Sequence, residues 1–217
     1  MRRGLFVVLE GLDGAGTTTQ AQALVRLLRA RGERAHCTAE PSSGPIGSQI
    51  RMMLAGRLVG YRGGPWDRRS LALLFAADRL DHLAADIEPR LAAGQHVVCD
   101  RYVLSSLAYQ SLDNDEDWVA EINRYAPPPD LTFFLRVPAK VALQRRLADG
   151  PGRPELFETL PQQRRIERLY ERGIARIGRK HRVHVVDGTA PLEHVTAALW
   201  RIVERRLARR DRATKGR

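Results

Sequence analysis

The sequence predicts an α/β fold: a five-stranded parallel sheet with helices on both faces. Five short apolar runs, several rich in β-branched residues, alternate with stretches whose apolar residues recur at helical spacing. Strands separated by helices pair in parallel, because each helix returns the chain to the starting edge of the sheet. The predicted strands cover residues 5–9, 35–39, 96–99, 131–137 and 183–186.

The intervening segments predict the helices. The first helix starts at Thr18, after a glycine-rich turn, and ends near Arg31 and Gly32. The longest pattern contains Pro89, which predicts a kink or break there. No repeat or linker divides the chain, so we expect one domain over residues 1–217. The other predicted helices cover residues 46–54, 66–93, 138–148, 157–180 and a last segment from Pro191 onward.

The chain is strongly basic, with 36 Lys and Arg against 25 Asp and Glu and a net charge of +11. Much of the excess lies in a basic tail at about 205–217. Two interpretations are open: a helix with a solvated basic face that frays at its end, or a nucleic-acid-binding patch. We favour the first, because no nucleic-acid-binding motif accompanies the tail, and we do not expect nucleic acid as a partner.

Composition also bears on the compartment. The two cysteines, Cys37 and Cys99, lie in apolar strand-like runs without metal-ligand spacing, which favours small buried side chains in a reducing compartment. No apolar run approaches the roughly 18 residues needed to span a membrane. The apolar stretch at the start ends at Glu10, too early for a signal peptide. We therefore expect a cytoplasmic protein without a membrane partner.

The glycine-rich turn carries the first functional motif. GLDGAGTT (residues 11–18) follows a strand and opens a helix, as the Walker A loop GxxxxGK[ST] does. Glycines let successive N–H groups point inward, and the helix N-terminus adds positive potential, so the loop forms an anion cradle. Thr18 stands where a hydroxyl ligand for Mg²⁺ is expected. The alternative is a strand–helix turn that binds no ligand.

Thr17 departs from this motif, because it occupies the lysine position. A hydroxyl donates a hydrogen bond but carries no charge to neutralise the terminal phosphates. By analogy with the deletion of one preorganised donor, the loss in rate is about 10²–10³-fold, unless another cation replaces the lysine.

Longer strings extend the comparison over nearly the whole chain. They are VVLEGLDGAGTTTQ (7–20), EPSSGPIGSQIR (40–51), LLFAADRLDH (73–82), VVCDRYVLSSLAYQ (97–110) and VDGTAPLEHV (186–195). In this order and spacing the strings resemble the thymidylate kinase family, a group of P-loop nucleoside monophosphate kinases. The resemblance implies phosphorylation of dTMP to dTDP by ATP with Mg²⁺, and a homodimer that packs through the helix at residues 71–83.

The resemblance also implies a set of ligand contacts. Thr18 and Asp100 would hold Mg²⁺, Asp100 through water. Asp13, Arg101 and Arg153 would be catalytic. The implied ATP contacts are Gly11, Leu12, Asp13, Gly14, Ala15, Gly16, Thr17, Thr18, Thr19, Arg145, Asp187 and Thr189. The implied dTMP contacts are Asp13, Pro41, Arg51, Phe75, Arg79, Arg101, Ser105, Ser106, Tyr109 and Gln110.

Several of these residues have a role in the implied dTMP site. Phe75 would stack on thymine and Arg79, four residues later on the same helix face, would hydrogen-bond the base. Arg101 would bind the dTMP phosphate, which suits a guanidinium fork. The segment 105–110 would contact the base edge and crowd the 2′ position of the sugar. Without the resemblance, Phe75 would be a core residue, Arg79 a surface charge, and Asp100 with Arg101 an ion pair.

Two further segments would enclose ATP. Residues 145–158 align with a mobile lid, in which Leu156 replaces an expected arginine. We hypothesise that Arg153 swings over the phosphates and partly replaces the missing lysine; the alternative is an ordinary exposed arginine. Asp187 and Thr189 would lie against adenine, or would simply form a turn and helix cap. Three functions follow in order of preference: a dTMP kinase, a nucleotide-binding protein with slow transfer, and a nucleic-acid-associated P-loop protein.

Overall fold

The computed structural model describes residues 2–148 and 159–215, and it confirms the predicted parallel sheet. Five strands lie in the order β2-β3-β1-β4-β5, and every neighbouring pair is parallel. The strands are β1 (Phe6–Gly11), β2 (Ala35–Ala39), β3 (His96–Asp100), β4 (Leu131–Arg136) and β5 (Val183–Asp187).

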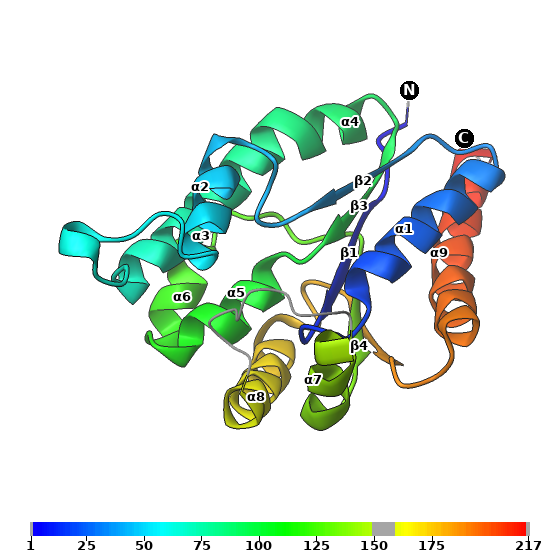
Figure 1. Cartoon of the computed structure of the whole chain (residues 1–217). Coiled ribbons are helices and arrows are strands. Elements are labelled where there is room, and N and C mark those ends of the chain that lie inside the picture. The colour runs from blue at the N-terminus through cyan, green and yellow to red at the C-terminus, as the bar shows by residue number, and fades with distance from the viewer. Residues whose placement is uncertain (1, 149–158, 216–217) are drawn as a thin grey trace.

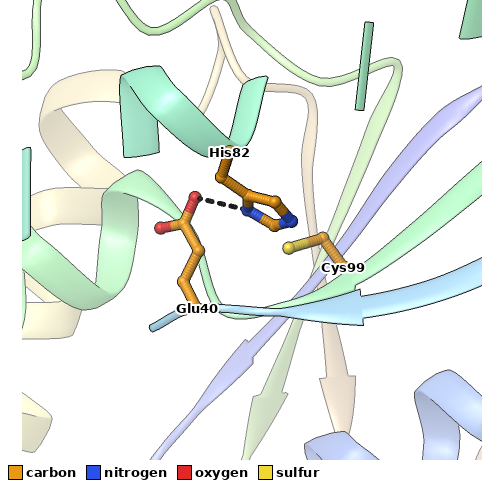
Figure 2. A group of neighbouring side chains, drawn as sticks. All are labelled: Glu40, His82 and Cys99. Atoms are coloured by element: carbon orange, nitrogen blue, oxygen red, sulfur yellow. Dashed lines mark ion pairs between the residues drawn. The ribbon is translucent and has the colours of Figure 1, made fainter. Parts of the chain in front are cut away.

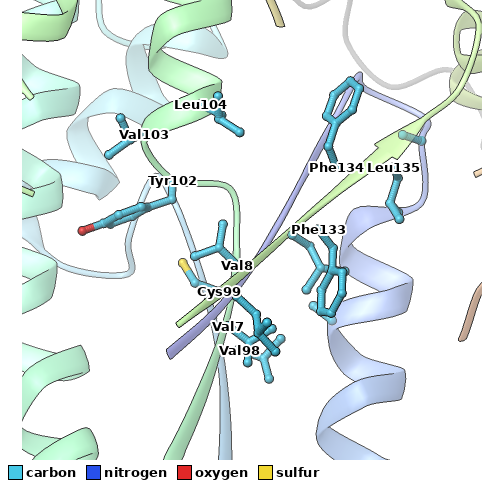
Figure 3. Close-up of a cluster of buried hydrophobic side chains, with 14 of the residues drawn as sticks. Val7, Val8, Val98, Cys99, Tyr102, Val103, Leu104, Phe133, Phe134 and Leu135 are labelled. Atoms are coloured by element: carbon cyan, nitrogen blue, oxygen red, sulfur yellow. The ribbon is translucent and has the colours of Figure 1, made fainter. Parts of the chain in front are cut away.

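The central strands are apolar because they are covered on both faces. All residues of β1 and β3 are buried, whereas the edge strands β2 and β5 are partly exposed. Successive side chains of β4 point to opposite faces, so Phe133 and Phe134 leave the strand in different directions (Figure 3). Phe134 packs on Tyr170, with ring centroids 5.1 Å apart. The sheet is therefore the centre of the larger hydrophobic core, and a smaller apolar cluster lies between α2 (Pro45–Leu54) and α3 (Arg68–His82).

Helices cover both faces of this sheet (Figure 1). On one face, α1 (Thr17–Ala30) lies beside α9 (Leu192–Lys215). On the other face, α5 (Val103–Tyr109) packs against α8 (Leu160–Ile177). The register brings the carboxyl ends of the strands together, since Leu9 of β1 lies beside both Asp100 and Phe133. Loops that leave these ends share one edge of the sheet.

The long helical pattern predicted for residues 66–93 is three consecutive segments. Helix α3 (Arg68–His82) begins after Asp67, whose carboxylate accepts hydrogen bonds from two backbone N–H groups of the first turn. A π-helical segment (Leu83–Ile87) follows and leads into α4 (Glu88–Ala92). Pro89 lies in the first turn of α4, where its missing N–H costs no hydrogen bond. The predicted irregularity thus falls just before Pro89.

The remaining elements connect the strands. They are α2 (Pro45–Leu54), a 3₁₀ turn (Tyr61–Gly63), a second 3₁₀ turn (Gln110–Leu112), α6 (Glu116–Ile122) and α7 (Ala139–Ala148). Helix α6 was not predicted. Its EDWVAEI segment has only seven residues, too short to show a helical period, and its start is fixed by Asp115, whose side chain accepts a hydrogen bond from the Trp118 N–H at 2.9 Å.

The basic tail is more tightly held than the expected solvated, fraying helix. Helix α9 continues to Lys215, and Arg206 pairs with Asp130 at 3.3 Å. Arg210 donates to the backbone carbonyl of Arg3. Part of the positive charge thus binds the helix to the amino edge of the sheet. In the described part of the chain, no helix combines the length and the apolar character that crossing a membrane requires.

Candidate active site

The glycine-rich loop joins β1 to α1 at the carboxyl edge of the sheet. Gly14 and Gly16 have φ angles of 86° and 90°, which glycine adopts without steric cost. Within the described residues, no side chain caps α1, so the N–H groups of its first turn are not occupied by a capping side chain. The turn therefore has the backbone donors and the helix dipole that an anion cradle needs.

The same loop is held closely by α7. A Cβ added to Gly14 would lie 2.1 Å from the carbonyl oxygen of Ala142, so only glycine fits. Thr17 is buried, and its methyl group lies 3.3 Å from where a Cβ on Gly11 would be. The position that carries lysine in the Walker A motif thus holds a small, packed, uncharged side chain.

All ten residues that the sequence assigned to dTMP binding line one cavity of about 230 Å³. They come from four parts of the chain: the glycine-rich loop (Asp13), the segment after β2 with helix α2 (Pro41, Arg51), helix α3 (Phe75, Arg79), and the segment after β3 (Arg101, Ser105, Ser106, Tyr109 and Gln110). Glu40, Leu54, Leu71 and Tyr102 complete the wall. Residues as far apart in the chain as Asp13 and Gln110 thus meet around one cavity.

Arg101 connects this cavity with the P-loop. Its guanidinium donates to the Gly11 carbonyl at 3.1 Å, to the Ser105 hydroxyl at 3.2 Å and to the Asp13 carboxylate at 2.5 Å. Burial alone would lower its pKa, but Tyr109 and Asp13 outweigh burial and raise the pKa of Arg101 well above its usual value. The side chain therefore remains cationic.

The backbone of Arg101 is also unusual, with φ of 71°, a left-handed conformation that costs a non-glycine residue roughly 1–3 kcal/mol. Its N–H donates to the Leu9 carbonyl at 2.8 Å, which ties the turn to β1. The conformation places the side chain between the loop and the cavity, where an anion could be contacted from both sides.

Arg79 is buried at the back of the cavity, with all five of its N–H donors engaged. Two of them bind one Glu40 oxygen, at 2.9 and 2.6 Å. The others reach the Ser106 hydroxyl, the Tyr102 carbonyl and the side-chain oxygen of Asn123. A hydrogen bond from Arg79 to a base, as the sequence predicted, would therefore require an exchange of one of these partners. In this structure Arg79 holds the cavity-lining residues Glu40, Tyr102 and Ser106 in place.

Glu10 was not predicted as a site residue, yet it fixes the turn that carries Arg101. Its carboxylate accepts from the Tyr102 N–H at 2.9 Å and from the Ser105 hydroxyl at 2.5 Å. Burial raises the pKa of Glu10 to about 7, although Ser105 and Arg101 oppose the shift. The signal in the sequence was a carboxylate at the end of an apolar strand, directly before the glycine-rich loop.

Tyr170 was also missed. Its hydroxyl donates to the Gly11 carbonyl at 3.0 Å and lies 2.9 Å from the Ser105 hydroxyl. Burial raises the pKa of this phenol well above its usual value. Because Tyr170 lies within α8 and shows no motif, only the folded chain brings it to the loop.

Thr18 and Asp100 meet as the sequence predicted for a metal site. The Thr18 hydroxyl donates to one oxygen of Asp100. The second Asp100 oxygen is buried and has no hydrogen-bond partner among the described residues. An unpartnered carboxylate oxygen beside a hydroxyl fits a hard divalent cation such as Mg²⁺, which prefers oxygen ligands. Both residues line a groove of about 670 Å³ that also includes Pro41 and Arg51.

Three of the predicted ATP contacts also lie together. Arg145, at the end of α7, donates to the Gly188 carbonyl at 2.8 Å and to the Thr189 carbonyl at 3.3 Å. Asp187 accepts from the Thr189 backbone at 2.8 Å, which closes the turn after β5. Arg153 and Leu156, in the predicted lid, lie outside the described residues.

This arrangement defines a class of protein: a phosphate-binding loop at the carboxyl edge of a parallel sheet, beside a cavity with a buried arginine, is typical of P-loop phosphotransferases. Comparison with known proteins is more specific. The thymidylate kinase family model matches residues 9–199.

Curated relatives extend over the same length. A probable thymidylate kinase of Pyrococcus abyssi is 37% identical over 206 residues, which is 94% of this chain and 98% of the relative. A thymidylate kinase of Thermomicrobium roseum is 40% identical over 204 residues, covering 91% and 93% of the two chains. The chain belongs to the thymidylate kinase family, whose members phosphorylate dTMP to dTDP with ATP as donor.

Proposed function

We propose that the cavity around Phe75 and Arg101 binds dTMP, and that the P-loop presents the terminal phosphoryl group of ATP to it. The observation that carries this proposal is the convergence of all ten expected contacts on one cavity adjoining the glycine-rich loop. Family membership assigns the reaction; the convergence supports this assignment of residues to it.

The half-buried Phe75 side chain lines the cavity, where it would stack on the thymine ring. Tyr109 donates to one oxygen of Asp13 at 3.0 Å, while Arg101 occupies the other. When dTMP enters, its phosphate competes with Asp13 for the Arg101 fork, because guanidinium binds phosphate as well as carboxylate. The released Asp13 oxygen then becomes an acceptor for a sugar hydroxyl. Binding therefore exchanges one charged contact for another.

Phosphoryl transfer needs positive charge and fixed geometry more than covalent chemistry. Arg101 contacts both the Gly11 carbonyl and the cavity, so it can remain near the phosphoryl group from donor to acceptor. Thr18 and Asp100 would hold Mg²⁺, which supplies charge neutralisation to the phosphates when bound. Arg145 reaches the 187–189 turn at the adenine end of the predicted donor site.

The missing lysine charge has to come from elsewhere if transfer is fast. Arg101 is the candidate among the described residues, and Arg153 is a second candidate in the predicted lid. Turnover of Arg153→Ala should fall relative to the wild type if Arg153 contributes. Unchanged turnover would leave Arg101, which donates to the Gly11 carbonyl, as the remaining candidate.

One pair of measurements tests the proposal: dTDP production from dTMP and ATP in a coupled assay, and calorimetric titration with dTMP. We expect both binding and turnover, with binding weakened in Phe75→Ala. Absence of dTMP binding to the purified protein would contradict the proposed cavity.

A second function is favoured by Thr17 alone: a nucleotide-binding protein that transfers slowly. Tight dTMP binding without dTDP formation at saturating ATP and Mg²⁺ would identify it. A role on nucleic acid has less support, since Arg206 and Arg210 of the basic tail bind the chain itself. Salt-dependent DNA or RNA binding that disappears when residues 205–217 are deleted would establish such a role.

The enzyme is also proposed to act as a cytoplasmic homodimer. Helix α3 exposes Leu73 and Leu80, which are 50% and 42% accessible and suit a self-complementary apolar contact. Leu80→Arg should convert a dimer to a monomer in sedimentation velocity. A wild-type monomer would contradict the homodimer. The unpaired cysteines Cys37 and Cys99 agree with a reducing compartment.

A further inference from the structure

Three buried side chains that the phosphoryl-transfer chemistry does not use converge behind the cavity. Glu40 follows β2, His82 ends α3, and Cys99 lies in β3 (Figure 2). Their potential ligand atoms all lie within 4.8 Å of one another. The exposed fractions are 6% for Glu40, 4% for His82 and 0% for Cys99.

Two of these atoms lack any hydrogen-bond partner within the described residues: Oε1 of Glu40 and Nδ1 of His82. They face each other at 3.6 Å, which is too long for a hydrogen bond but is an ion pair when His82 is protonated (Figure 2). Buried polar atoms in proteins are nearly always satisfied. The opposite atoms of both groups are satisfied, since Oε2 of Glu40 binds Arg79 and Nε2 of His82 lies 2.7 Å from the Thr38 hydroxyl. The two atoms without hydrogen-bond partners therefore lie close to the Cys99 thiol, which donates to the Arg101 carbonyl at 3.1 Å.

A carboxylate oxygen, an imidazole nitrogen and a thiol are ligands that zinc accepts. A tetrahedral zinc ion holds its ligand atoms roughly 3.5 Å apart. The glutamate–histidine spacing of 3.6 Å fits this value, and the thiol lies within 4.8 Å of both other ligand groups. We propose that Glu40, His82 and Cys99 bind one zinc ion, with water as a fourth ligand. On binding, the Cys99 thiol gives its proton to the solvent and the sulfur coordinates as thiolate.

The neighbouring contacts suit such a site. Arg79 holds the other oxygen of Glu40, and Thr38 lies beside the other nitrogen of His82, so both ligands are oriented from behind. His82 lines the open groove beside Thr18, which gives an ion a route inward. Glu40 lines the dTMP cavity, so the ion would lie directly behind its wall.

This site is chemically distinct from the one at Thr18 and Asp100. That pair offers only oxygen atoms and suits Mg²⁺, whereas the three-residue site includes sulfur and nitrogen, which select borderline metals. The difference gives a spectroscopic test, because a thiolate bound to Co²⁺ produces an intense charge-transfer band in the near ultraviolet and oxygen ligands do not.

The experiment is a Co²⁺ titration of the whole, metal-stripped protein under reducing conditions, with excess Mg²⁺ present to fill the oxygen site. The wild type should develop the thiolate band to one equivalent, and one equivalent of Zn²⁺ should abolish it. Cys37→Ser is the matched control, because Cys37 is the only other cysteine in the chain, and it should keep the band. Cys99→Ser should lose it. A band that survives Cys99→Ser, or no band in the wild type, would overturn the proposal.

A second measurement, the change in Tm on adding Zn²⁺, separates loss of a ligand from misfolding of a variant. Zn²⁺ at 100 times its dissociation constant should raise the folded-to-unfolded ratio about hundredfold for wild type and Cys37→Ser, and so raise Tm. Cys99→Ala and His82→Gln should be folded by circular dichroism but should show no Zn²⁺-dependent increase in Tm. An equal increase in all four proteins would place the ion elsewhere and contradict the proposed site.

Discussion

The proposed dTMP cavity and the glycine-rich loop lie side by side but are built differently. The cavity is formed by side chains with fixed partners: Arg79 has all five donors engaged, and Arg101 has four bonds within the protein. The loop offers backbone N–H groups and, at Thr17, no charge. The comparison indicates that the side chains of the proposed dTMP cavity hold one another in place, whereas the charge needed for transfer would have to come from residues outside the loop.

The largest effect should come from the residue that both regions share. Arg101→Ala removes the cation between loop and cavity, and kcat/KM should fall about 10³-fold, which is about 4 kcal/mol. Arg136→Ala, which removes only an exposed ion pair with Glu171, is the control and should stay within about twofold of wild type. Steady-state kinetics with both substrates measure the effect. A loss below tenfold for Arg101→Ala would mean that the two regions do not depend on a common charge.

The burial of Glu10, which fixes the turn that carries Arg101, should make the free energy of unfolding depend on pH. Glu10 has a pKa of about 7 in the folded protein against 4.5 for an ordinary glutamate. Because the pKa of Glu10 is raised in the folded state, its contribution to the stability of the fold is present below about pH 4.5 and is lost as the pH rises through 7. The loss amounts to about 3 kcal/mol.

Glu10→Gln cannot ionise, so its free energy of unfolding should decline less than that of wild type between pH 5 and pH 8. Urea denaturation at both pH values measures the difference. Glu33→Gln, which changes a glutamate whose side chain is 38% exposed, is the control. Parallel declines in wild type and Glu10→Gln would show that Glu10 ionises normally.

The loop can be tested by restoring its charge. Thr17→Lys should raise kcat about 10²-fold with little change in KM for dTMP, because the lysine would stabilise charge on the donor and not contact the base. Thr17→Ser keeps the hydroxyl without the charge and should resemble wild type. An increase below tenfold for Thr17→Lys would mean that an arginine already supplies what the loop lacks.

The smallest of the expected effects concerns the base. Phe75→Ala removes a stacking surface worth about 1–3 kcal/mol, so KM for dTMP should rise about tenfold while kcat changes little. Arg69→Ala changes a 75% exposed side chain on the same helix and controls for effects on α3. If both variants raise KM equally, the contribution of Phe75 is to helix packing and not to the base.

Much of the fold could be predicted because its strands are buried on both faces. The runs at 5–9 and 96–99 contain only apolar residues, apart from His96, and the structure extends them to Gly11 and Asp100. These end residues were not included, because glycine and aspartate rarely continue a strand. Helix α6 was missed for a different reason: its seven residues are too few to show a helical period, and its start depends on the Asp115 cap.

Motifs predicted the residues of the candidate site, but not the contacts and residues that hold them in place. The strings contained all ten residues predicted to bind dTMP, and these line the cavity together with Glu40, Leu54, Leu71 and Tyr102. The strings could not show that all five N–H donors of Arg79 are engaged, because its partners Glu40 and Asn123 lie 39 and 44 residues away. The role of Tyr170 was equally invisible, since an aromatic residue on an amphipathic helix is normally part of the core.

The close contact between Gly14 and Ala142 has a consequence for the donor nucleotide. Helix α7 touches the phosphate-binding loop through Ala142 and, one turn later, holds the Gly188 carbonyl through Arg145. The same short helix therefore sets the separation between the two ends of the predicted ATP site. A nucleotide whose base and terminal phosphate are spaced differently from those of ATP would meet a mismatch that the loop alone would not impose.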